Sequence, residues 1–145
     1  MIRTISIDLA LPLRQTVLWQ GHPPSHAMVP GDDTAQHFGL FHDNTLVSVA
    51  SLFPDDHSGI QLRKFATLPH MQSKGFGRRM LDHLRIQAQN AGATCLWCDA
   101  RLSARGFYAK SGFQEKGEIF ERKGRPYIVM SHTLNKATRA PSDSS

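Results

Sequence analysis

The order of hydrophobic and polar residues changes its period several times along the chain, and each change predicts an element of structure. Residues 3–7 alternate as in a short edge strand. Residues 9–19 place apolar side chains at helical spacing, with Pro12 tolerated in the first turn. The next stretch, GHPPSHAMVPGDD at residues 21–33, holds three prolines and two glycines. It predicts a long loop, which we interpret as a lid on the substrate side.

Three strands follow this loop. Residues 36–42 and 45–53 are strand-like and are joined at HDN, and residues 60–68 follow the turn PDDHSG. Because short turns join the three runs, they predict an antiparallel meander.

The second half of the chain predicts a helix, a strand and a second helix. Residues 75–90 form the first helix, which stops at the glycine of NAGA. Its apolar positions recur at intervals of three and four: Met80, Leu81, Leu84 and Ala88. A strand at residues 94–99 and a short helix at residues 103–110 come next.

Two last strands, residues 113–120 and 127–134, complete the order. This order predicts an α/β fold with a mixed sheet and a βαβ crossover between the fourth and fifth strands. Residues 1–134 are expected to form one domain. The tail, residues 135–145, has almost no apolar side chains and is expected to be disordered.

The two cysteines, Cys95 and Cys98, raise the question of a redox pair. They lie in TCLWCDA, an apolar run too short for a helix, which predicts a buried strand. Three residues of strand put the α-carbons about 10 Å apart, beyond the roughly 7 Å that a disulfide tolerates. The odd spacing also points the two side chains to opposite faces of the strand, so we expect packed thiols.

Composition and charge exclude few classes of function. The chain has 145 residues, of which 40% are hydrophobic, enough for the core of one domain. It has neither an 18-residue apolar run nor a start typical of a secretory signal, so we expect a cytoplasmic protein without membrane spans. A formal charge of +5 and a pI near 9.6 suit an anionic partner. The cations are dispersed and no basic stretch is interleaved with aromatic residues, which disfavours nucleic acid.

The stretch HMQSKGFGRRML, residues 70–81, carries the candidate chemistry. A glycine-rich turn between a strand and a helix aims free amides and the positive end of the helix dipole at one point, which suits an anion. Gly75 and Gly77 leave room for a phosphate, and Lys74, Arg78 or Arg79 adds charge. The glycine spacing fits neither the P-loop nor the dinucleotide fingerprint. The plainer alternative is a flexible turn that caps an exposed basic helix.

Two motifs together resemble the GNAT superfamily of acyl-CoA-dependent N-acetyltransferases. FATLPHMQSKGFG matches the family pattern Q/R-x-x-G-x-G/A after a strand, and ARGFYAKSGF is similar to the second family signature. The resemblance covers residues 3–134 and is strongest from Ile60 onward. It implies a central, mostly antiparallel sheet that splays between the fourth and fifth strands, with flanking helices.

The same resemblance implies a site for acetyl-CoA, with no metal. Backbone groups of Ala66 and Thr67 would pair with the pantetheine, and the amides from Gln72 to Arg78 would take the pyrophosphate. The implied cofactor contacts are Ala66, Thr67, Gln72, Ser73, Lys74, Gly75, Phe76, Gly77, Arg78, Ser103 and Arg105.

Tyr108 is the residue that the resemblance implies for catalysis. A phenol can protonate the CoA thiolate as it leaves. The competing interpretation is a core tyrosine packed with Phe107 and Phe113.

No general base can be identified, because the predicted fourth strand, IQLRKFATL, has no glutamate. Asp99 or His132 acting through water, or no base at all, stay open. The histidines at residues 22, 26, 37 and 42 do not share one face of an element, so a metal site is disfavoured.

The resemblance thus predicts transfer of an acetyl group from acetyl-CoA to a primary amine of a small molecule or peptide, by direct attack in a ternary complex. Its alternative is a catalytically silent acyl-CoA-binding sensor or partner-binding protein. The acceptor, the acyl-chain preference and the oligomeric state, a homodimer included, cannot be read from the sequence.

Overall fold

The computed structural model describes residues 1–18 and 28–134. Residues 19–27, which include the first part of the predicted lid, and the tail 135–145 lie outside the described residues. The chain divides into two compact units that alternate along the sequence. One consists of Met1–Phe53 and Leu62–His83, the other of Pro54–Gln61 and Leu84–Ser145.

Seven strands are hydrogen-bonded in the order β1-β2-β3-β4-β5-β7-β6. In the first unit, β1 (Ile2–Ile5) pairs antiparallel with β2 (Gln36–His42), which pairs antiparallel with β3 (Thr45–Pro54). β4 (Ile60–Thr67) returns beside β3. The meander predicted from the sequence is confirmed.

The turn between β2 and β3 shows why these strands form a tight hairpin. Asp43 and Asn44 both have positive φ, 50° and 64°, as a two-residue type I′ turn requires. Asparagine and aspartate tolerate this conformation better than most residues. The sequence HDN therefore determines the turn and the pairing next to it, up to the register shift between Leu40 and Phe41.

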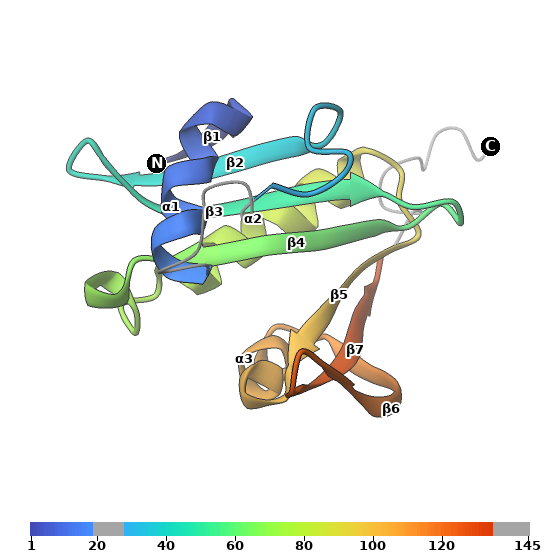
Figure 1. Ribbon diagram of the computed structural model, residues 1–145. Coiled ribbons are helices and arrows are strands. Elements are labelled where there is room, and N and C mark those ends of the chain that lie inside the picture. The colour runs from blue at the N-terminus through green and yellow to red at the C-terminus, as the bar shows by residue number, and fades with distance from the viewer. Residues whose placement is uncertain (19–27, 135–145) are drawn as a thin grey trace. The chain divides into compact units, whose positions relative to one another are not determined.

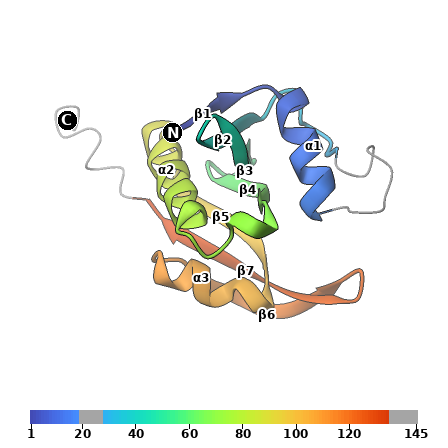
Figure 2. The ribbon, with the colours of Figure 1, turned by 90° about the vertical axis from the view of Figure 1, so that its left-hand side faces the viewer.

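Two helices cover the two faces of these strands. Figures 1 and 2 show α1 (Ile7–Leu18) on one face and the first turns of α2 (Phe76–Asn90) on the other. Under α1, the core contains Ile5, Ala10, Leu13, Val49 and Ala66. The predicted apolar positions of α2 are all buried, with at most 1% exposed: Met80, Leu81, Leu84 and Ala88.

Helix α1 begins two residues earlier than its apolar spacing predicts. The amides of Leu9 and Ala10 donate to the carbonyl of Ser6, so the first turn forms at Ile7. Pro12 consequently lies inside the helix, and the prediction that it occupies the first turn is wrong. Pro12 is exposed and has no backbone N–H, so it cannot donate the usual helical hydrogen bond. Its carbonyl accepts a hydrogen bond from the hydroxyl of Thr16 over 3.0 Å.

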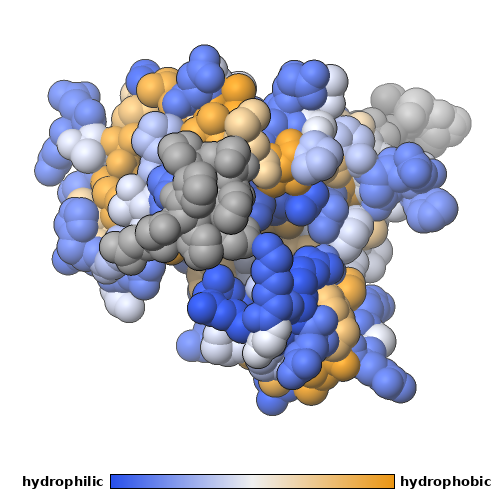
Figure 3. All heavy atoms as spheres, in the orientation of Figure 1, coloured by the Kyte–Doolittle hydropathy of each residue, from blue (hydrophilic) through white to orange (hydrophobic). Residues whose placement is uncertain are grey.

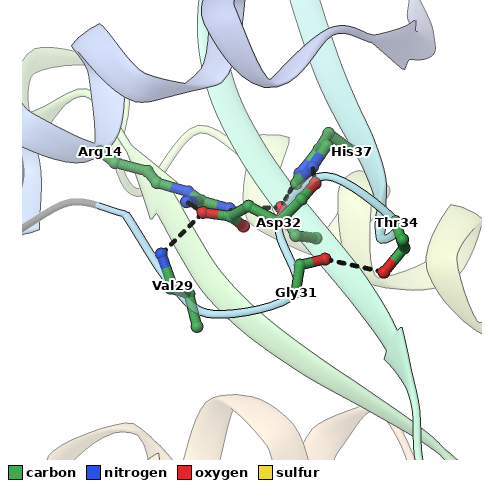
Figure 4. A network of polar contacts seen from close by, with 7 residues as sticks. Arg14, Val29, Gly31, Asp32, Thr34 and His37 are labelled. Carbon is green, nitrogen blue, oxygen red and sulfur yellow. Dashed lines mark hydrogen bonds and ion pairs between the residues drawn. The ribbon is translucent and has the colours of Figure 1, made fainter.

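A buried polar network ties α1 to the strands (Figure 4). Arg14, with no exposed surface, donates from Nη1 and Nη2 to both carboxylate oxygens of Asp32, at 2.8 and 3.0 Å. Arg14 Nη2 also donates to the hydroxyl of Ser51 over 2.9 Å. That hydroxyl lies 2.6 Å from Nδ1 of His37, whose Nε2 lies 2.7 Å from the backbone carbonyl of Asp32.

The direction of each bond in this network follows from its chemistry. Because a guanidinium only donates and a carbonyl only accepts, Ser51 donates to Nδ1 of His37, and the ring proton sits on Nε2. The amide of Val29 donates to Asp32 over 2.7 Å. Burial alone would raise the pKa of Asp32, but the bonds from Arg14 and Val29 and the charge of Arg14 hold it below its usual value.

In the second unit, β5 (Cys95–Arg101) pairs antiparallel with β7 (Arg125–Thr133), and β7 pairs antiparallel with β6 (Gln114–Arg122). β5 also pairs in parallel with the start of β4, where Ile60 faces Leu96 and Gln61 faces Trp97. This parallel pair confirms the predicted crossover and the mixed α/β sheet.

The strands β6 and β7 extend closer to the turn between them than the sequence predicts. Lys123 and Gly124 have φ of 51° and 78°, so the two strands continue to Arg122 and Arg125. Figure 3 shows mostly hydrophilic side chains, with a smaller apolar patch, over this hairpin and helix α3 (Arg105–Lys110).

One carboxylate fixes the turn before β4. Asp55 accepts the amides of His57 and Gly59, and its second oxygen accepts the indole N–H of Trp97 over 2.7 Å. A Cβ on Gly59 would lie 2.6 Å from this carboxylate, so the turn requires glycine. Both cysteines are free, with Cys98 buried in β5 and Cys95 half-buried, as predicted for packed thiols.

In the described part of the chain, no helix combines the length and apolar character needed to cross a membrane.

We expect Asp32→Asn to lower the free energy of unfolding by about 3–5 kcal/mol, because it leaves the buried charge of Arg14 uncompensated. Thermal and urea melts would measure the loss. The matched control is Asp33→Asn, since Asp33 is the exposed neighbour of Asp32. Equal stability of the two variants would contradict the role of the ion pair.

The same pair predicts a dependence on pH. A carboxylate whose pKa is lower in the folded state stabilises the fold above its unfolded pKa, about 3.9. That stabilisation is lost as the pH falls through the lower folded value. The difference between the wild type and Asp32→Asn should therefore stay constant from pH 7 to pH 5 and shrink below about pH 4.

Candidate functional site

The predicted cofactor residues of the first unit lie on the end of β4 and the loop that follows it. Lys64 has φ of 55°, so the strand departs from regular geometry two residues before Ala66. The carbonyl of Ala66 accepts from the hydroxyl of Ser48 over 3.1 Å. The carbonyl of Thr67 accepts from the side-chain amide of Gln72 over 2.9 Å. The last two carbonyls of β4 are thus held by side chains.

The loop from Leu68 to Gly75 contains one turn of 3₁₀ helix, Pro69–Met71, and then two residues with positive φ. Ser73 has φ of 63° and Gly75 has φ of 88°. A Cβ on Gly75 would meet no atom within 4 Å, so the glycine is needed for its backbone conformation and leaves open space beside the chain.

Helix α2 starts directly after this loop. Its first intrahelical bond runs from the amide of Arg79 to the carbonyl of Gly75, so the amides of Phe76, Gly77 and Arg78 precede that bond. The first turn contains no acidic residue to neutralise the helix dipole. The N-terminus of α2 therefore presents free amides in a positive field, which is suited to an anion.

The charged side chains of this region point to solvent. Lys74 and Arg78 are exposed, and the guanidinium of Arg79 lies 5.9 Å from the ring of Phe76. The loop that the sequence singles out thus combines left-handed backbone, open space and exposed cations. The alternative, a glycine turn capping a basic helix, has the same local geometry and differs only in lacking a ligand.

The predicted catalytic residue, Tyr108, belongs to the second unit. It lies on α3 with 8% of its surface exposed, and its ring packs edge-on against those of Phe107 and Phe113. Its hydroxyl is hydrogen-bonded with the thiol of Cys98. The packing expected of a core tyrosine is present, together with a polar partner for the phenol.

Burial determines the protonation of both groups. It raises the pKa of Tyr108 well above the ordinary value, and the neighbouring Cys98 raises it further. Burial, with a smaller contribution from the charge of Asp99, raises the pKa of Cys98 to about 12 despite the bond with Tyr108. Phenol and thiol therefore both keep their protons at neutral pH.

The other two predicted cofactor contacts are accessible. Ser103 is exposed in the 3₁₀ turn Leu102–Ala104. Arg105 is half-exposed, and its Nε lies 3.9 Å from Glu115. An exposed ion pair at this distance adds little stability, so the guanidinium is free to bind another anion.

Each of the two candidates for a general base has one hydrogen-bond partner, which leaves Nε2 of His132 as an acceptor. Asp99 accepts from Arg122 over 3.0 Å, and Nδ1 of His132 lies 2.8 Å from the carbonyl of Thr133. In the part of the chain that the structure describes, no three His, Cys, Asp or Glu side chains cluster as metal ligands would. His37 has both ring nitrogens bonded in the network of Arg14.

A separate shallow pocket of about 460 Å³ lies in the first unit. It touches the predicted loop only through the neighbouring residue Arg79, so it does not identify the cofactor site. Its lining comprises Met1, Arg3, Phe41, His42, Asp43, Asn44 and Arg79.

Two buried features were missed in the sequence. Arg14 lies beside apolar residues of α1, and Ser48 lies in the apolar run VSVAS of β3. Each is a polar residue in an otherwise buried pattern. That was the only available signal, because their partners are distant in sequence.

Comparison with known proteins identifies one family for this chain. The model of the acetyltransferase (GNAT) domain family matches residues 22–134. The uncharacterised N-acetyltransferase YitI of Bacillus subtilis (strain 168) is 32% identical, over 92% of this chain and 95% of its own length.

Two solved structures show the same fold. Escherichia coli ElaA superposes with a TM-score of 0.80 at 16% identity, covering 91% of this chain and 98% of its own. A GNAT family acetyltransferase from Elizabethkingia anophelis with acetyl-CoA bound has a TM-score of 0.73 at 16% identity, covering 92% of this chain and 97% of its own.

The two thiols should differ in reactivity. With a pKa of about 12, Cys98 is ionised to roughly one part in ten thousand at pH 8, and it is buried as well. We expect iodoacetamide at pH 8 to modify the folded protein at Cys95 alone, and to modify Cys98 only after unfolding. Mass spectrometry of the wild type and of Cys95→Ser would measure this. Rapid alkylation of folded Cys95→Ser would disprove the protected environment of Cys98.

Proposed function

The chain belongs to the GNAT acetyltransferase family, and on that premise we propose that it transfers the acetyl group of acetyl-CoA to a primary amine of a small molecule or peptide. The observation that carries the proposal is the loop before α2. Its left-handed Ser73 and Gly75 and the amides of Phe76, Gly77 and Arg78 form a cradle suited to a pyrophosphate.

The cofactor contacts are proposed along the chain. The backbone of Ala66 and Thr67 pairs with the pantetheine amides, and the loop from Gln72 to Arg78 binds the pyrophosphate. Lys74 and Arg78 balance the phosphate charge. Ser103 and Arg105, accessible at the start of α3, contribute further contacts to the cofactor.

In the proposed reaction the neutral amine attacks the thioester carbonyl, and a tetrahedral intermediate forms. As the intermediate collapses, the C–S bond breaks, the amide forms, and the amine nitrogen releases a proton to water. The CoA thiolate takes a proton or a hydrogen bond from Tyr108. A phenol left without its proton would regain one from solvent.

The high pKa of Tyr108 determines which role its phenol can have toward the departing thiolate. The phenol is a donor at every neutral pH. Full proton transfer to a thiolate whose conjugate acid has a pKa near about 8.5 is uphill for a phenol above 10. We therefore assign Tyr108 a hydrogen bond that stabilises the departing thiolate, with solvent completing the protonation.

A direct transfer in a ternary complex is favoured over an acyl-enzyme. The thiol hydrogen-bonded with Tyr108, Cys98, is buried and protonated, and a thiol in that form is a poor nucleophile.

The second candidate is a silent acyl-CoA-binding sensor, which one observation favours. β4 carries Gln61, Arg63 and Lys64 but no carboxylate, so it offers no base for the amine. Both candidates bind acetyl-CoA, and turnover separates them. The test is titration calorimetry with acetyl-CoA, followed by thiol release against a panel of amines and peptides. Absence of binding at millimolar acetyl-CoA would remove both candidates, and binding without turnover on any amine would support the sensor.

We expect Gly77→Asp to weaken acetyl-CoA binding by about a hundredfold or more, because it sets a carboxylate and a Cβ against the pyrophosphate. The control is Ile86→Asp, which adds the same charge at an exposed position of the same helix. Calorimetry would measure both affinities. Equal affinities would show that the pyrophosphate does not lie at the start of α2.

We expect Tyr108→Phe to lower kcat by about a hundredfold, the lower end of the range for a positioned donor. Affinity for acetyl-CoA should change little. Tyr127→Phe is the control, since Tyr127 is the other tyrosine and stacks on Phe120 in the β6–β7 hairpin. Full turnover of Tyr108→Phe, with a normal thermal melt, would return Tyr108 to a structural role.

A further inference from the structure

A buried hydroxyl lies against the end of β4. Ser48, in the middle of β3, has no exposed surface. Its Oγ donates to the carbonyl of Ala66 over 3.1 Å and lies 2.9 Å from Oγ1 of Thr67. The carbonyl of Thr67 accepts the side-chain amide of Gln72 over 2.9 Å. One chain of hydrogen bonds thus runs from β3 through the last residues of β4 into the loop before α2.

The number of hydroxyl protons determines which group donates in each of these hydrogen bonds. Ser48 has a single hydroxyl proton, and it goes to the carbonyl of Ala66. The hydroxyl of Thr67 must therefore donate to Ser48. Each hydroxyl then has a defined partner, and the orientation of the Ala66 carbonyl depends on both.

The sequence around Ser48 makes a purely structural role costly. Its neighbours in β3, Val47, Val49 and Ala50, are all buried with at most 1% exposed. A hydroxyl in such surroundings costs free energy unless it is hydrogen-bonded, and an apolar side chain of similar size would avoid that cost. The only bonds that the structure gives this hydroxyl lead to Ala66 and Thr67.

The end of β4 is also where the strand needs support. Lys64, with φ of 55°, interrupts the regular backbone two residues before Ala66. Beyond that point the amide of Leu68 still donates to the carbonyl of Val47. Ser48 adds side-chain bonds to Ala66 and Thr67, so it limits how the carbonyl of Ala66 and the side chain of Thr67 can turn.

We propose that Ser48 is a positioning residue for acetyl-CoA. Its bond to the carbonyl of Ala66 and its bond with the hydroxyl of Thr67 hold the end of β4 in the orientation that binds the pantetheine. The bond from Gln72 to the carbonyl of Thr67 extends the same alignment into the pyrophosphate loop. This inference rests on the proposed function, because it deepens the cofactor site described there.

The test compares two serines of one strand. Ser48 and Ser51 are both buried in β3, but three residues apart they face opposite sides of the sheet, and Ser51 bonds Arg14 and His37. Loss of a hydrogen bond worth about 0.5–1.5 kcal/mol corresponds to a change in affinity of about two- to tenfold. We expect Ser48→Ala to raise the Kd and KM for acetyl-CoA by that factor, with the acceptor KM unchanged. Ser51→Ala should lower the thermal midpoint and leave the Kd for acetyl-CoA unchanged.

A double-mutant cycle tests whether the two hydroxyls act together. Thr67→Val keeps the branched shape and removes the hydroxyl that donates to Ser48. If the bonds form one chain, the double variant should lose about as much affinity as either single variant, and not the product of the two losses. Should Ser48→Ala fail to fold, Thr67→Val at its half-buried position carries the same test on Kd.

Three results would overturn the inference: an unchanged Kd in Ser48→Ala, an equal loss of affinity in Ser51→Ala, or losses that multiply in the double variant. Each presupposes that the wild type binds acetyl-CoA. A wild type that does not bind would instead contradict the proposed function, so the two failures are distinguishable.

Discussion

A guanidinium without exposed surface must be paired inside the protein, and this requirement shapes the first unit. Arg14 on α1 is neutralised by Asp32, which comes from the far side of the connection between α1 and β2. The connection must therefore return to α1. The carbonyl of the same Asp32 accepts from His37, and Ser51 joins Arg14 to His37, so helix, connection, β2 and β3 are held by one set of bonds.

Strand β3 separates this structural network from the proposed cofactor site. Successive side chains of a strand face opposite sides, so Ser51 reaches the ion pair under α1 while Ser48 faces the other side, where it bonds the end of β4. Two serines in one apolar run thus have different consequences. Ser51 supports a buried charge, whereas Ser48 bonds the carbonyl of Ala66 and the hydroxyl of Thr67, which belong to the proposed cofactor site.

The sequence predicted those features that depend on neighbouring residues. Periodic apolar positions predicted where α2 lies, and HDN predicted a hairpin turn. The odd spacing of the two cysteines in a strand predicted that they do not form a disulfide. The start of α1 was missed because Ser6, which the alternating pattern assigned to the preceding strand, supplies the first helical carbonyl. The networks of Arg14 and Ser48 were missed because their partners lie 18 or more residues away. For the site, the loop geometry was predictable from its glycines. The choice between core and acid for Tyr108 was not, since burial against Phe113 suits both.

In the proposed reaction, the group whose protonation changes in the neutral pH range is the amine of the substrate, so the pH dependence of the rate follows from that amine. A phenol and a thiol with raised pKa values stay protonated across the neutral range, so Tyr108 does not change its charge there. Asp99 is bonded to Arg122, and β4 has no carboxylate, so the described residues offer no free carboxylate base at these positions. Without a protein base, an amine must lose its own proton to water before it can attack. The fraction of neutral amine, set by the pKa of the acceptor, then governs how the rate rises with pH.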